Sequence, residues 1–491
     1  MKKLRRTDSN AASDATLLAL VRLMTMCLSL VTTRVLSTYL STFEYGTYAQ
    51  VMLITTTATS LTIMGLIDAA NYYYCGTQET EKRESYVATI FTLQCCTGVL
   101  AGMVILLLAG PICSYFGNAQ LRGYLIFTAV LPLLQNGISL LQVLLVSVGK
   151  ARQLAIRNLI ISVVRMLCAI VAGMYKNVRV VFAVSVILNS GQILFFWWSL
   201  KKSGCYIRLA ACNFRLSSSI LKYSVPMAAY TLVNTLNRDM DKYLISAVTD
   251  TETLAIYSNA AKILPFDILL TSFMTVLVPY ITRQIAQERY GDAVSTYRSY
   301  LEISYISTAL LACGVLSAAP EAMQLLYSEK YLSGLPVFCV YIINDIFHFA
   351  NITLILSASG KTKLLMRLGF VGLAANFVLN ILLYHLLGVV GPALATLLVS
   401  LGLGVCILHF SAQQLRASMR ELFDRKYLLM FSLECVCGAA AFSVVRYWLC
   451  AAGVHYLAVL VIIGAGYVLC VGLPNRKHFM RALKQISALK S

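Results

Sequence analysis

Long apolar runs separated by short polar breaks recur along the whole chain. A helix of about 20 residues crosses the hydrocarbon core of a bilayer, which is about 30 Å thick. Runs of this length cover approximately residues 15–38, 47–70, 86–110, 121–147, 154–174, 178–200, 218–247, 254–282, 300–320, 331–357, 364–386, 390–410, 427–447 and 454–473. They lack the alternation of barrel strands, and lipid satisfies no backbone polar group. The pattern predicts an all-α polytopic membrane protein with about 14 transmembrane helices.

Composition agrees with this pattern and excludes soluble classes of protein. Of the 491 residues 59% are hydrophobic and only 12% are charged, against about 25% charged in soluble domains. The net charge of +19 would otherwise favour a nucleic-acid-binding protein. Most of the 15 cysteines lie inside apolar runs and no C-x-x-C spacing occurs. We therefore expect free thiols that pack as small hydrophobic groups.

The distribution of Lys and Arg predicts the orientation in the membrane. With the N-terminus in the cytoplasm, the inward connections contain 29 Lys and Arg and the outward connections contain 4. Positive residues are retained on the cytoplasmic side. We expect both termini in the cytoplasm, an uncleaved first helix, and an attraction of the basic connections to anionic lipid headgroups rather than to nucleic acid.

No connection is long enough for a soluble catalytic domain. The longest inward connections, near residues 201–217 and 283–299, are short. The sequence contains no P-loop, no H-E-x-x-H motif and no G-x-S-x-G motif, so an ATP-driven pump or a membrane hydrolase has no support. We expect a protein that is not an enzyme and needs no cofactor.

Two short motifs recur at nearly the same spacing. Gly149–Arg152 resembles Gly360–Lys363 at an offset of 211, and Tyr48 corresponds to Tyr257 at an offset of 209. Equal helix parity makes the copies parallel repeats of six helices. The expected organisation is a cytoplasmic tail 1–14, an N-lobe 15–200, a linker 201–217, a C-lobe 218–410, and two additional helices with a cytoplasmic tail in 411–491.

Several segments together resemble the polysaccharide transporters, typified by O-antigen flippases, of the multidrug/oligosaccharidyl-lipid/polysaccharide exporter superfamily. The similarity spans most of the chain. The matching segments are Leu221–Pro226, Asp241–Tyr243, Ile256–Lys262, Ser359–Lys363, Asn376, Asn380 and Gly388–Thr396. Each segment is a loose match, but their order and spacing follow the family.

The resemblance implies two six-helix lobes around a cavity that opens alternately to the two sides of the bacterial inner membrane. The implied substrate is an undecaprenyl-diphosphate-linked oligosaccharide for surface polysaccharide biosynthesis. Implied partners are membrane lipids, a polysaccharide polymerase and glycosyltransferases. Fourteen predicted helices rather than 12 depart from the commonest form and are also seen in the lipid II flippase branch.

Cationic residues inside the predicted spans are the candidates for substrate binding, because a charge in the membrane usually faces a bundle interior or a wet cavity. The candidates are Arg22, Arg34, Arg165, Arg238, Lys242, Lys262 and His348. Arg34 aligns within one residue of Lys242 under the repeat offset. Such a pair of cations suits a diphosphate, which accepts directional hydrogen bonds from Arg. The alternatives are snorkelling and, for Arg238 and Lys242, pairing with Asp239 and Asp241.

Acidic residues in the spans are candidates for coupling to a H⁺ or Na⁺ gradient. They are Asp241, Asp345 and Asp68, with Asp267, Glu302 and Glu434 as further candidates for coupling or for ion pairing. Asn344, His348 and Asn351 share one helical face near Asp345. This face suits sugar hydroxyls, and the alternative for the two Asn is hydrogen bonding between helices.

Three other functions stay open at this stage. The first is a cation-coupled multidrug exporter of the same superfamily, which would favour an acidic cavity. The 7 Lys and Arg within or beside the predicted spans argue against this function. A membrane glycan polymerase or ligase would need an extended outer loop for its chemistry. A non-transporting scaffold in a glycan assembly complex is the third.

Overall fold

Helices form every regular element in the described part of the chain. A computed structural model describes residues 2–63, 65–76, 79–175, 177–262, 264, 266, 277–278 and 280–488. Within these ranges there is no strand, which confirms the predicted all-α class. The chain forms two compact units, residues 1–255 and 256–491.

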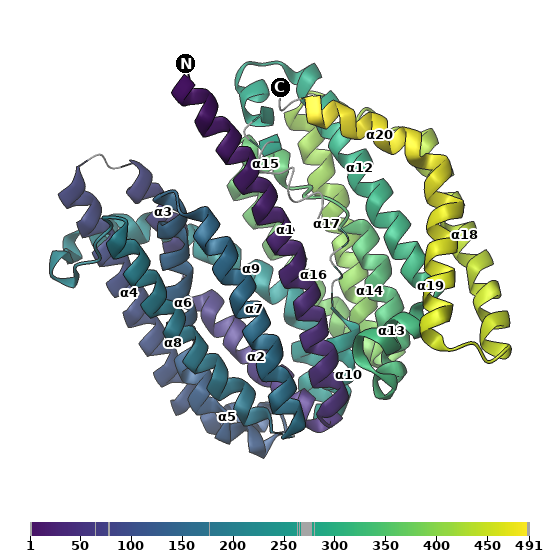
Figure 1. Cartoon of the computed structure of the whole chain (residues 1–491), viewed down its shortest axis with the longest axis horizontal. Helices are drawn as coiled ribbons and strands as arrows, with labels where there is room; N and C mark the ends of the chain where they lie inside the picture. The colour runs from purple at the N-terminus through teal and green to yellow at the C-terminus, as the bar shows by residue number, and fades with distance from the viewer. Residues whose placement is uncertain are drawn as a thin grey trace. The chain divides into compact units, whose positions relative to one another are not determined.

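The described residues of the first unit form ten α-helices, the last of which ends just beyond this unit. They are α1 (Lys2–Tyr39), α2 (Thr42–Ile63), α3 (Leu66–Gly76), α4 (Thr80–Leu107), α5 (Ala109–Tyr115), α6 (Leu125–Ser147), α7 (Ala151–Met174), α8 (Val178–Lys202), α9 (Ser217–Val248) and α10 (Thr251–Ala260). Gly65 separates α2 from α3 at a φ of +62°, a conformation that glycine adopts without strain. In Figure 1, α4, α6 and α8 lie side by side, in agreement with their packing.

In the second unit, the helices whose full bounds the structure describes begin at residue 290. They are α12 (Tyr290–Ser317), α13 (Ala319–Tyr327), α14 (Leu335–Phe347), α15 (Leu354–Ala358), α16 (Thr362–Leu387), α17 (Val390–Gln414), α18 (Arg425–Ala451), α19 (Tyr456–Tyr467) and α20 (Leu473–Ala488). The predicted run 331–357 is thus divided between α14 and α15. The predicted run 254–282 begins in α10, and much of it lies outside the described residues.

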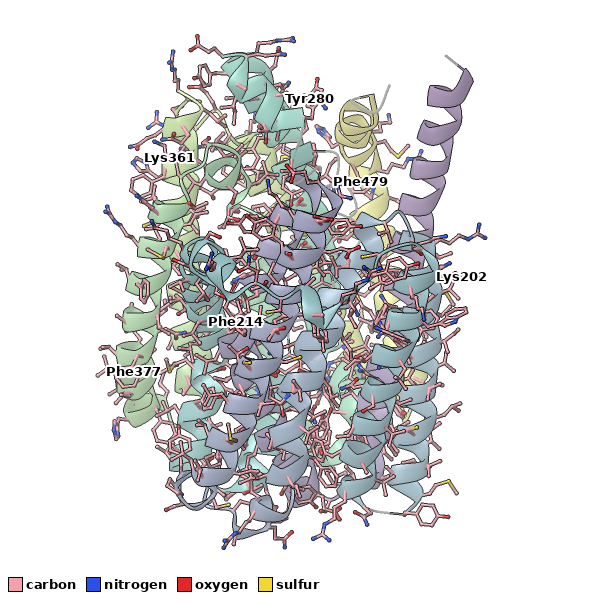
Figure 2. All side chains as sticks on the ribbon, turned by 90° about the vertical axis from the view of Figure 1, so that its left-hand side faces the viewer. Lys202, Phe214, Tyr280, Lys361, Phe377 and Phe479 are labelled. Carbon is pink, nitrogen blue, oxygen red and sulfur yellow. The ribbon has the colours of Figure 1, made fainter. Side chains whose placement is uncertain are left out.

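Ten helices among the described residues are long and apolar enough to cross a membrane. Many large apolar side chains lie on their outer surfaces. Leu107 is 81% exposed, Trp198 57% and Phe377 52%, and Figure 2 shows Phe377 projecting outward from α16. A soluble protein rarely leaves so much apolar surface in water, whereas hydrocarbon solvates it. The chain is a multi-pass membrane protein.

The internal repeat is confirmed by the lengths and spacing of the helices. Helices α4 and α12 each have 28 residues and begin at residues 80 and 290, an offset of 210. Helices α8 and α17 each have 25 residues and begin at 178 and 390, an offset of 212. The short element order α5, 3₁₀-helix (Ala119–Gly123), α6 recurs as α13, 3₁₀-helix (Glu329–Gly334), α14. Gly149 and Gly360, from the repeated motif, both have a positive φ.

The boundary between the compact units lies beyond the first helix of the second repeat. Helix α9 packs against α2, α3 and α4 of the first unit. Thr235 Oγ1 donates to Ser60 Oγ at 3.1 Å, and the Tyr73 hydroxyl donates to the Ser219 carbonyl at 3.2 Å. The lobes 15–200 and 218–410 were defined by the sequence repeat, whereas the packing places α9 in the first unit. These lobes stay a prediction.

Each unit has its own apolar core between its helices. In the first unit, buried side chains of α6 such as Leu140 and Leu144 pack with Ile90 and Phe196. In the second unit, Tyr297 of α12 belongs to a core that also contains Leu408 and Ala412 of α17. The 14 cysteines whose side chains are described are free thiols, as the sequence predicted.

Candidate functional site

A polar cavity lies among the helices of the first unit. Its volume is about 420 Å³, and its lining comes from α1, α2, α6, α7 and α8. The lining residues are Thr25, Thr59, Gln135, Ile138, Ser139, Gln142, Arg157, Asn158, Ile161, Ser162, Arg165, Asn189 and Gln192. Since α6, α7 and α8 are all long and apolar enough to span a membrane, this concentration of amides, hydroxyls and guanidinium groups is a candidate binding site.

Arg157 is held in the wall of this cavity with only 8% of its surface exposed. Its Nη1 donates to Asn158 Oδ1 at 2.6 Å. The guanidinium carbon lies 4.4 Å from the centre of the Phe196 ring, a cation–π arrangement that fixes the guanidinium plane. Its Nε and Nη2 are buried and have no hydrogen-bond partner among the described residues.

Arg165 lies two turns further along α7 and lines the same cavity. Eight residues correspond to about 12 Å along a helix axis. Its side chain is exposed, and Nη2 donates to Asn189 Oδ1 at 3.4 Å. Asn189 Oδ1 also accepts from Gln192 Nε2 at 3.1 Å. Among the described lining residues none is acidic, so the cavity is cationic.

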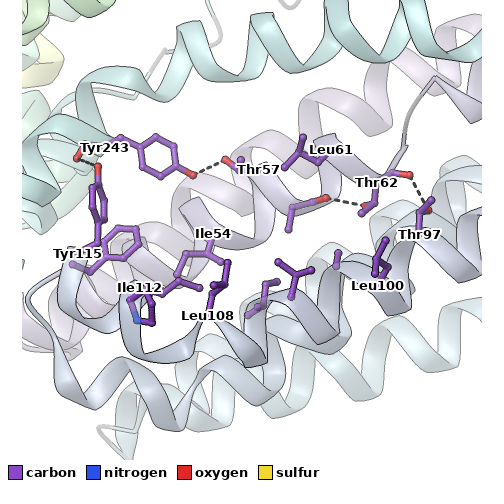
Figure 3. Close-up of a pocket in the computed structure, with 16 residues that line it drawn as sticks. Ile54, Thr57, Leu61, Thr62, Thr97, Leu100, Leu108, Ile112, Tyr115 and Tyr243 are labelled. Carbon is purple, nitrogen blue, oxygen red and sulfur yellow. Dashed lines mark hydrogen bonds between the residues drawn. The ribbon is translucent and has the colours of Figure 1, made fainter.

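An apolar groove of about 620 Å³ lies on another face of α2 (Figure 3). Its lining comes from α2, α4, α5 and α9, and from two residues that adjoin these helices, Leu108 and Phe116. The lining residues are Ile54, Thr57, Ala58, Leu61, Thr62, Thr97, Leu100, Ala101, Val104, Ile105, Leu108, Pro111, Ile112, Tyr115, Phe116 and Tyr243. Figure 3 shows Thr57 hydrogen-bonded to the Tyr243 hydroxyl and Thr62 bonded to Thr97. These few polar groups are paired with one another, so the open surface of the groove is hydrocarbon.

Helix α2 contributes to the lining of both the polar cavity and the apolar groove. Thr59 lines the polar cavity, where its Oγ1 donates to Gln135 Oε1 at 2.9 Å. The neighbouring Ala58 and Leu61 line the apolar groove. One helix therefore separates a cationic cavity from an apolar groove within the first unit.

Of the predicted cations, Arg165 is the one that the structure places in the polar cavity. Arg22 is exposed on α1, and it is not among the residues that line the cavity. Arg34 on the same helix is partly buried and engaged in interactions. The matching of Arg34 with Lys242 across the repeat stays a prediction.

The charged cluster on α9 is paired internally. Lys242 Nζ contacts Asp239 Oδ1 at 2.7 Å, and Arg238 Nη2 contacts Asp239 Oδ2 at 3.2 Å. Asp241 is fully buried, and its Oδ1 accepts from the backbone N–H of Lys242 at 2.8 Å. This arrangement corresponds to the alternative of pairing: Lys242 contacts Asp239, as their helical spacing indicated, and Arg238 contacts the same carboxylate.

Lys262, Asp345 and His348 each have a polar contact within the second unit. Lys262 Nζ donates to Asn259 Oδ1 at 3.1 Å. Asp345 Oδ2 accepts from the backbone N–H of Leu264 at 2.9 Å, so this carboxylate is occupied in holding the chain after α10. His348 is exposed, with Nδ1 3.2 Å from the Asn344 carbonyl.

The remaining acidic candidates differ in their surroundings. Asp68, in the first turn of α3, is exposed. Glu302 accepts from Arg298 Nε at 2.9 Å, and Glu434 accepts from Asn475 Nδ2 at 2.8 Å. Asp267 lies outside the described residues. In the described part of the chain no group of His, Cys, Asp and Glu is arranged to hold a metal ion.

Sequence reasoning missed Arg157. The Lys and Arg count assigned it to the basic connection with Lys150 and Arg152, although it lies in the second turn of α7 and faces the cavity. A signal was available in the neighbouring apolar runs, where Gln142 and Gln192 interrupt runs of Leu, Ile and Val. Amides at such positions indicate a polar interior.

Comparison with known families supports the resemblance found in the sequence. The model of a family described as "Polysaccharide biosynthesis protein" matches residues 35–336, which is more than half of the chain. The chain belongs to this family. A search of curated proteins gives no match.

Solved structures place this family member in a known fold. A lipid II flippase, MurJ, in an inward closed conformation shares 16% identity with a TM-score of 0.74, covering 94% of this chain and 99% of its own. The MATE transporter VcmN of Vibrio cholerae shares 14% identity with a TM-score of 0.61, covering 85% and 98%. A superfamily transporter from Pyrococcus furiosus has 12% identity and a TM-score of 0.57, covering 82% and 95%. The fold is that of the exporter superfamily predicted from the sequence.

Proposed function

We propose that the protein is a flippase that moves an undecaprenyl-diphosphate-linked oligosaccharide across the bacterial inner membrane during surface polysaccharide biosynthesis. The observation that supports this most is the polar cavity of the first unit. Its amides and hydroxyls suit sugar hydroxyl groups, and Arg157 and Arg165 suit a phosphate. Family membership supports the link to polysaccharide biosynthesis.

The apolar groove supports a substrate that is part lipid. A prenyl chain gains no hydrogen bonds and needs only an apolar surface, which Leu100, Val104 and Leu108 of the groove offer. Because α2 contributes to both the groove and the cavity, a ligand with a polar head and an apolar tail would contact both of its faces. The tail would stay against lipid and the groove while the head crosses.

Transport would proceed by alternating access of the two six-helix repeats. Both termini would lie in the cytoplasm, as the Lys and Arg count predicts. A H⁺ or Na⁺ gradient would drive the cycle through an acidic residue such as Asp68, which is exposed. A polysaccharide polymerase and glycosyltransferases would act before or after this step.

Two rivals belong to the same superfamily. A multidrug exporter with cationic substrates would favour acidic groups in its cavity, whereas the described lining here is cationic. A lipid II flippase has the same class of substrate, a lipid-linked diphosphate, and differs only in the glycan. The sugar therefore decides between this rival and the proposed function.

Deletion of the gene tests the proposal directly. The proposed function predicts that one lipid-linked oligosaccharide accumulates on the cytoplasmic leaflet and that the corresponding surface polysaccharide is lost. A plasmid that carries the wild-type gene should reverse both effects. Accumulation of lipid II with arrest of growth would assign the lipid II flippase, and sensitivity to cationic drugs with normal surface glycan would assign a multidrug exporter.

A further inference from the structure

The connection between α8 and α9 exposes large apolar side chains. This first connection, residues 203–216, joins the two repeats and lies within the first unit. Tyr206 is 41% exposed, Leu209 61% and Phe214, which is labelled in Figure 2, 66%. A short connection in water rarely leaves so many large apolar groups uncovered, so this surface indicates a binding partner.

The other side of the first connection is fixed to the helices beneath it. Cys205, Ile207 and Leu216 pack against the apolar core of the first unit. The backbone N–H of Asn213 donates to Thr89 Oγ1 on α4 at 3.0 Å. The exposed apolar side chains are therefore presented on a framework that packing holds in place.

The equivalent connection of the second copy is built differently. This second connection, residues 415–424, follows α17. Gly204 and Arg416 mark the same position after α8 and α17, and both have a positive φ. Leu415 and Leu422 are buried in the core of the second unit. The second connection contains two carboxylates, whereas the first contains none. Exposed apolar groups with only positive charge are thus specific to the first connection.

The positive charges at the first connection lie over aromatic rings. Measured from the Lys nitrogen or the guanidinium carbon to the ring centre, the pairs are Lys201 with Trp197 at 5.2 Å, Lys202 with Trp198 at 5.3 Å and Arg208 with Tyr206 at 5.4 Å. Trp and Tyr are enriched at the headgroup level of a bilayer, where Lys and Arg side chains reach the phosphates. This combination is typical of a membrane interface.

Lys201, Arg208 and Trp197 line one small pocket of about 140 Å³. Among the described residues Lys201 forms no ion pair, and Arg208 forms only a long one, with Nη1 3.9 Å from Glu84 Oε2. The side chains of Lys201 and Arg208 are both exposed. The pocket is therefore cationic and has room for one anionic headgroup rather than for a whole lipid.

The outer face of α8 continues the pocket with hydrocarbon. Ile187, Leu194 and Trp198 are exposed at spacings of seven and four residues, which place them on one stripe of the helix. Helix α8 is long and apolar enough to span a membrane. A ligand that covers both the pocket and this stripe needs an anionic head and apolar tails.

We propose that Lys201 and Arg208, beside Trp197, bind the headgroup phosphate of an anionic phospholipid in the leaflet next to the first connection. The acyl chains lie along α8, and Leu209 and Phe214 rest in the interface. This pocket shares no lining residue with the polar cavity. The lipid is a resident of the bilayer and not the transported molecule, so the inference does not depend on the proposed function.

Tryptophan fluorescence of the full-length protein tests the site. Two of the three tryptophans, Trp197 and Trp198, lie at the pocket, so Trp448→Phe leaves a protein whose emission reports on it. In neutral detergent micelles, phosphatidylglycerol with brominated chains should quench this emission with an apparent Kd about tenfold lower than that of brominated phosphatidylcholine, since each cation contributes about fivefold. Equal quenching by the two lipids would overturn the proposal.

Paired substitutions locate the preference. Lys201→Gln with Arg208→Gln, in the Trp448→Phe background, should abolish the preference for phosphatidylglycerol. The matched control is Arg416→Gln with Arg420→Gln, which removes two exposed cations from the second connection and should keep the preference. Equal loss in both pairs, or no loss in the first pair, would contradict a specific site.

Competition experiments without these substitutions identify the source of the phosphate. Unbrominated phosphatidylglycerol should displace the brominated lipid, and soluble glycerol phosphate at the same concentration should not. Displacement by glycerol phosphate would assign the pocket to a free phosphate. Displacement by farnesyl diphosphate at far lower concentration than by phosphatidylglycerol would assign it to a lipid-linked diphosphate. Either result would overturn the proposal.

A single reporter tests whether the first connection touches lipid at all. Phe214→Trp, in a protein whose three native tryptophans are replaced by Phe, should be quenched by both brominated lipids. Emission of a fully solvated indole without quenching would show that the connection faces water, where a soluble protein could dock instead. That outcome would also overturn the proposed lipid site.

Discussion

Arg446 on α18 donates through Nη1 to Glu321 Oε1 on α13 at a distance of 3.1 Å. Glu321 is only 5% exposed, and Cys450 Sγ approaches the same oxygen at 3.4 Å. Both helices belong to the second unit. The pair therefore ties the first additional C-terminal helix to the second repeat, which the sequence did not indicate, because Arg446 was counted simply as a residue of an outward connection.

Loss of this pair is expected to weaken the second unit. Arg446→Ala leaves the buried Glu321 carboxylate without its cation, and the free energy of unfolding should fall by roughly 3 kcal/mol. Thermal unfolding of the purified protein in detergent measures this. Glu321→Gln combined with Arg446→Ala should recover part of the loss. If Arg446→Ala alone melts at the wild-type temperature, the pair does not stabilise the protein.

The cluster on α9 gives a prediction about Lys242. Because Lys242 and Asp239 lie 2.7 Å apart, Lys242→Gln should destabilise the protein by roughly 1–3 kcal/mol and lower its level in the membrane. Asp239→Asn added to Lys242→Gln removes both charges and should restore the level. Transport by the restored double variant then reports whether Lys242 contacts substrate. Full transport would refute its predicted binding role.

Filling the apolar groove should slow transport without loss of protein. Ala101 lines the groove on α4, so Ala101→Trp places an indole in the space proposed for the prenyl chain. A decrease of roughly tenfold corresponds to about 1.4 kcal/mol of lost binding. Leu107→Trp on the same helix is the control, since Leu107 is 81% exposed. Equal rates for both variants at equal abundance would exclude the groove from the substrate path.

Orientation in the membrane can be measured with reporter fusions. Alkaline phosphatase fused after Lys202 or at the C-terminus should be inactive, and green fluorescent protein at the same points should fluoresce, because the Lys and Arg count places both in the cytoplasm. A fusion in the outward connection near Arg179 should give the opposite pattern. Active phosphatase at the C-terminus would reverse the predicted topology.

The sequence predicted the helices well because each apolar run has to match one fixed thickness of hydrocarbon. The repeat was also accessible, since Gly149 and Gly360 mark the same turn in both copies. The interruption after Phe347 was not predicted, because Asn344, His348 and Asn351 have the spacing of one polar face on a continuous helix.

The candidate site was only partly accessible from the sequence. Arg165 was found because a charge in the middle of an apolar run is conspicuous. Arg157 was not found, because near the end of a run a buried arginine and a solvated one look the same in one dimension. The pairing of Lys242 with Asp239 could be predicted from their helical spacing on α9, whereas the contact of Arg238 with Asp239 required side-chain geometry.

The repeat also shows where the two copies have become different. Helices α7 and α16 begin at residues 151 and 362, an offset of 211, so that Arg157 corresponds to Leu368 and Arg165 to Asn376. Neither cavity arginine has an arginine at the corresponding position of the second copy, in which Arg367 lies one position before Leu368. A ligand shifts a conformational equilibrium only through the state-dependent contacts it makes. A carrier that binds its anionic cargo through Arg157 and Arg165 would therefore contact that cargo asymmetrically, because the corresponding residues of the second copy are Leu368 and Asn376.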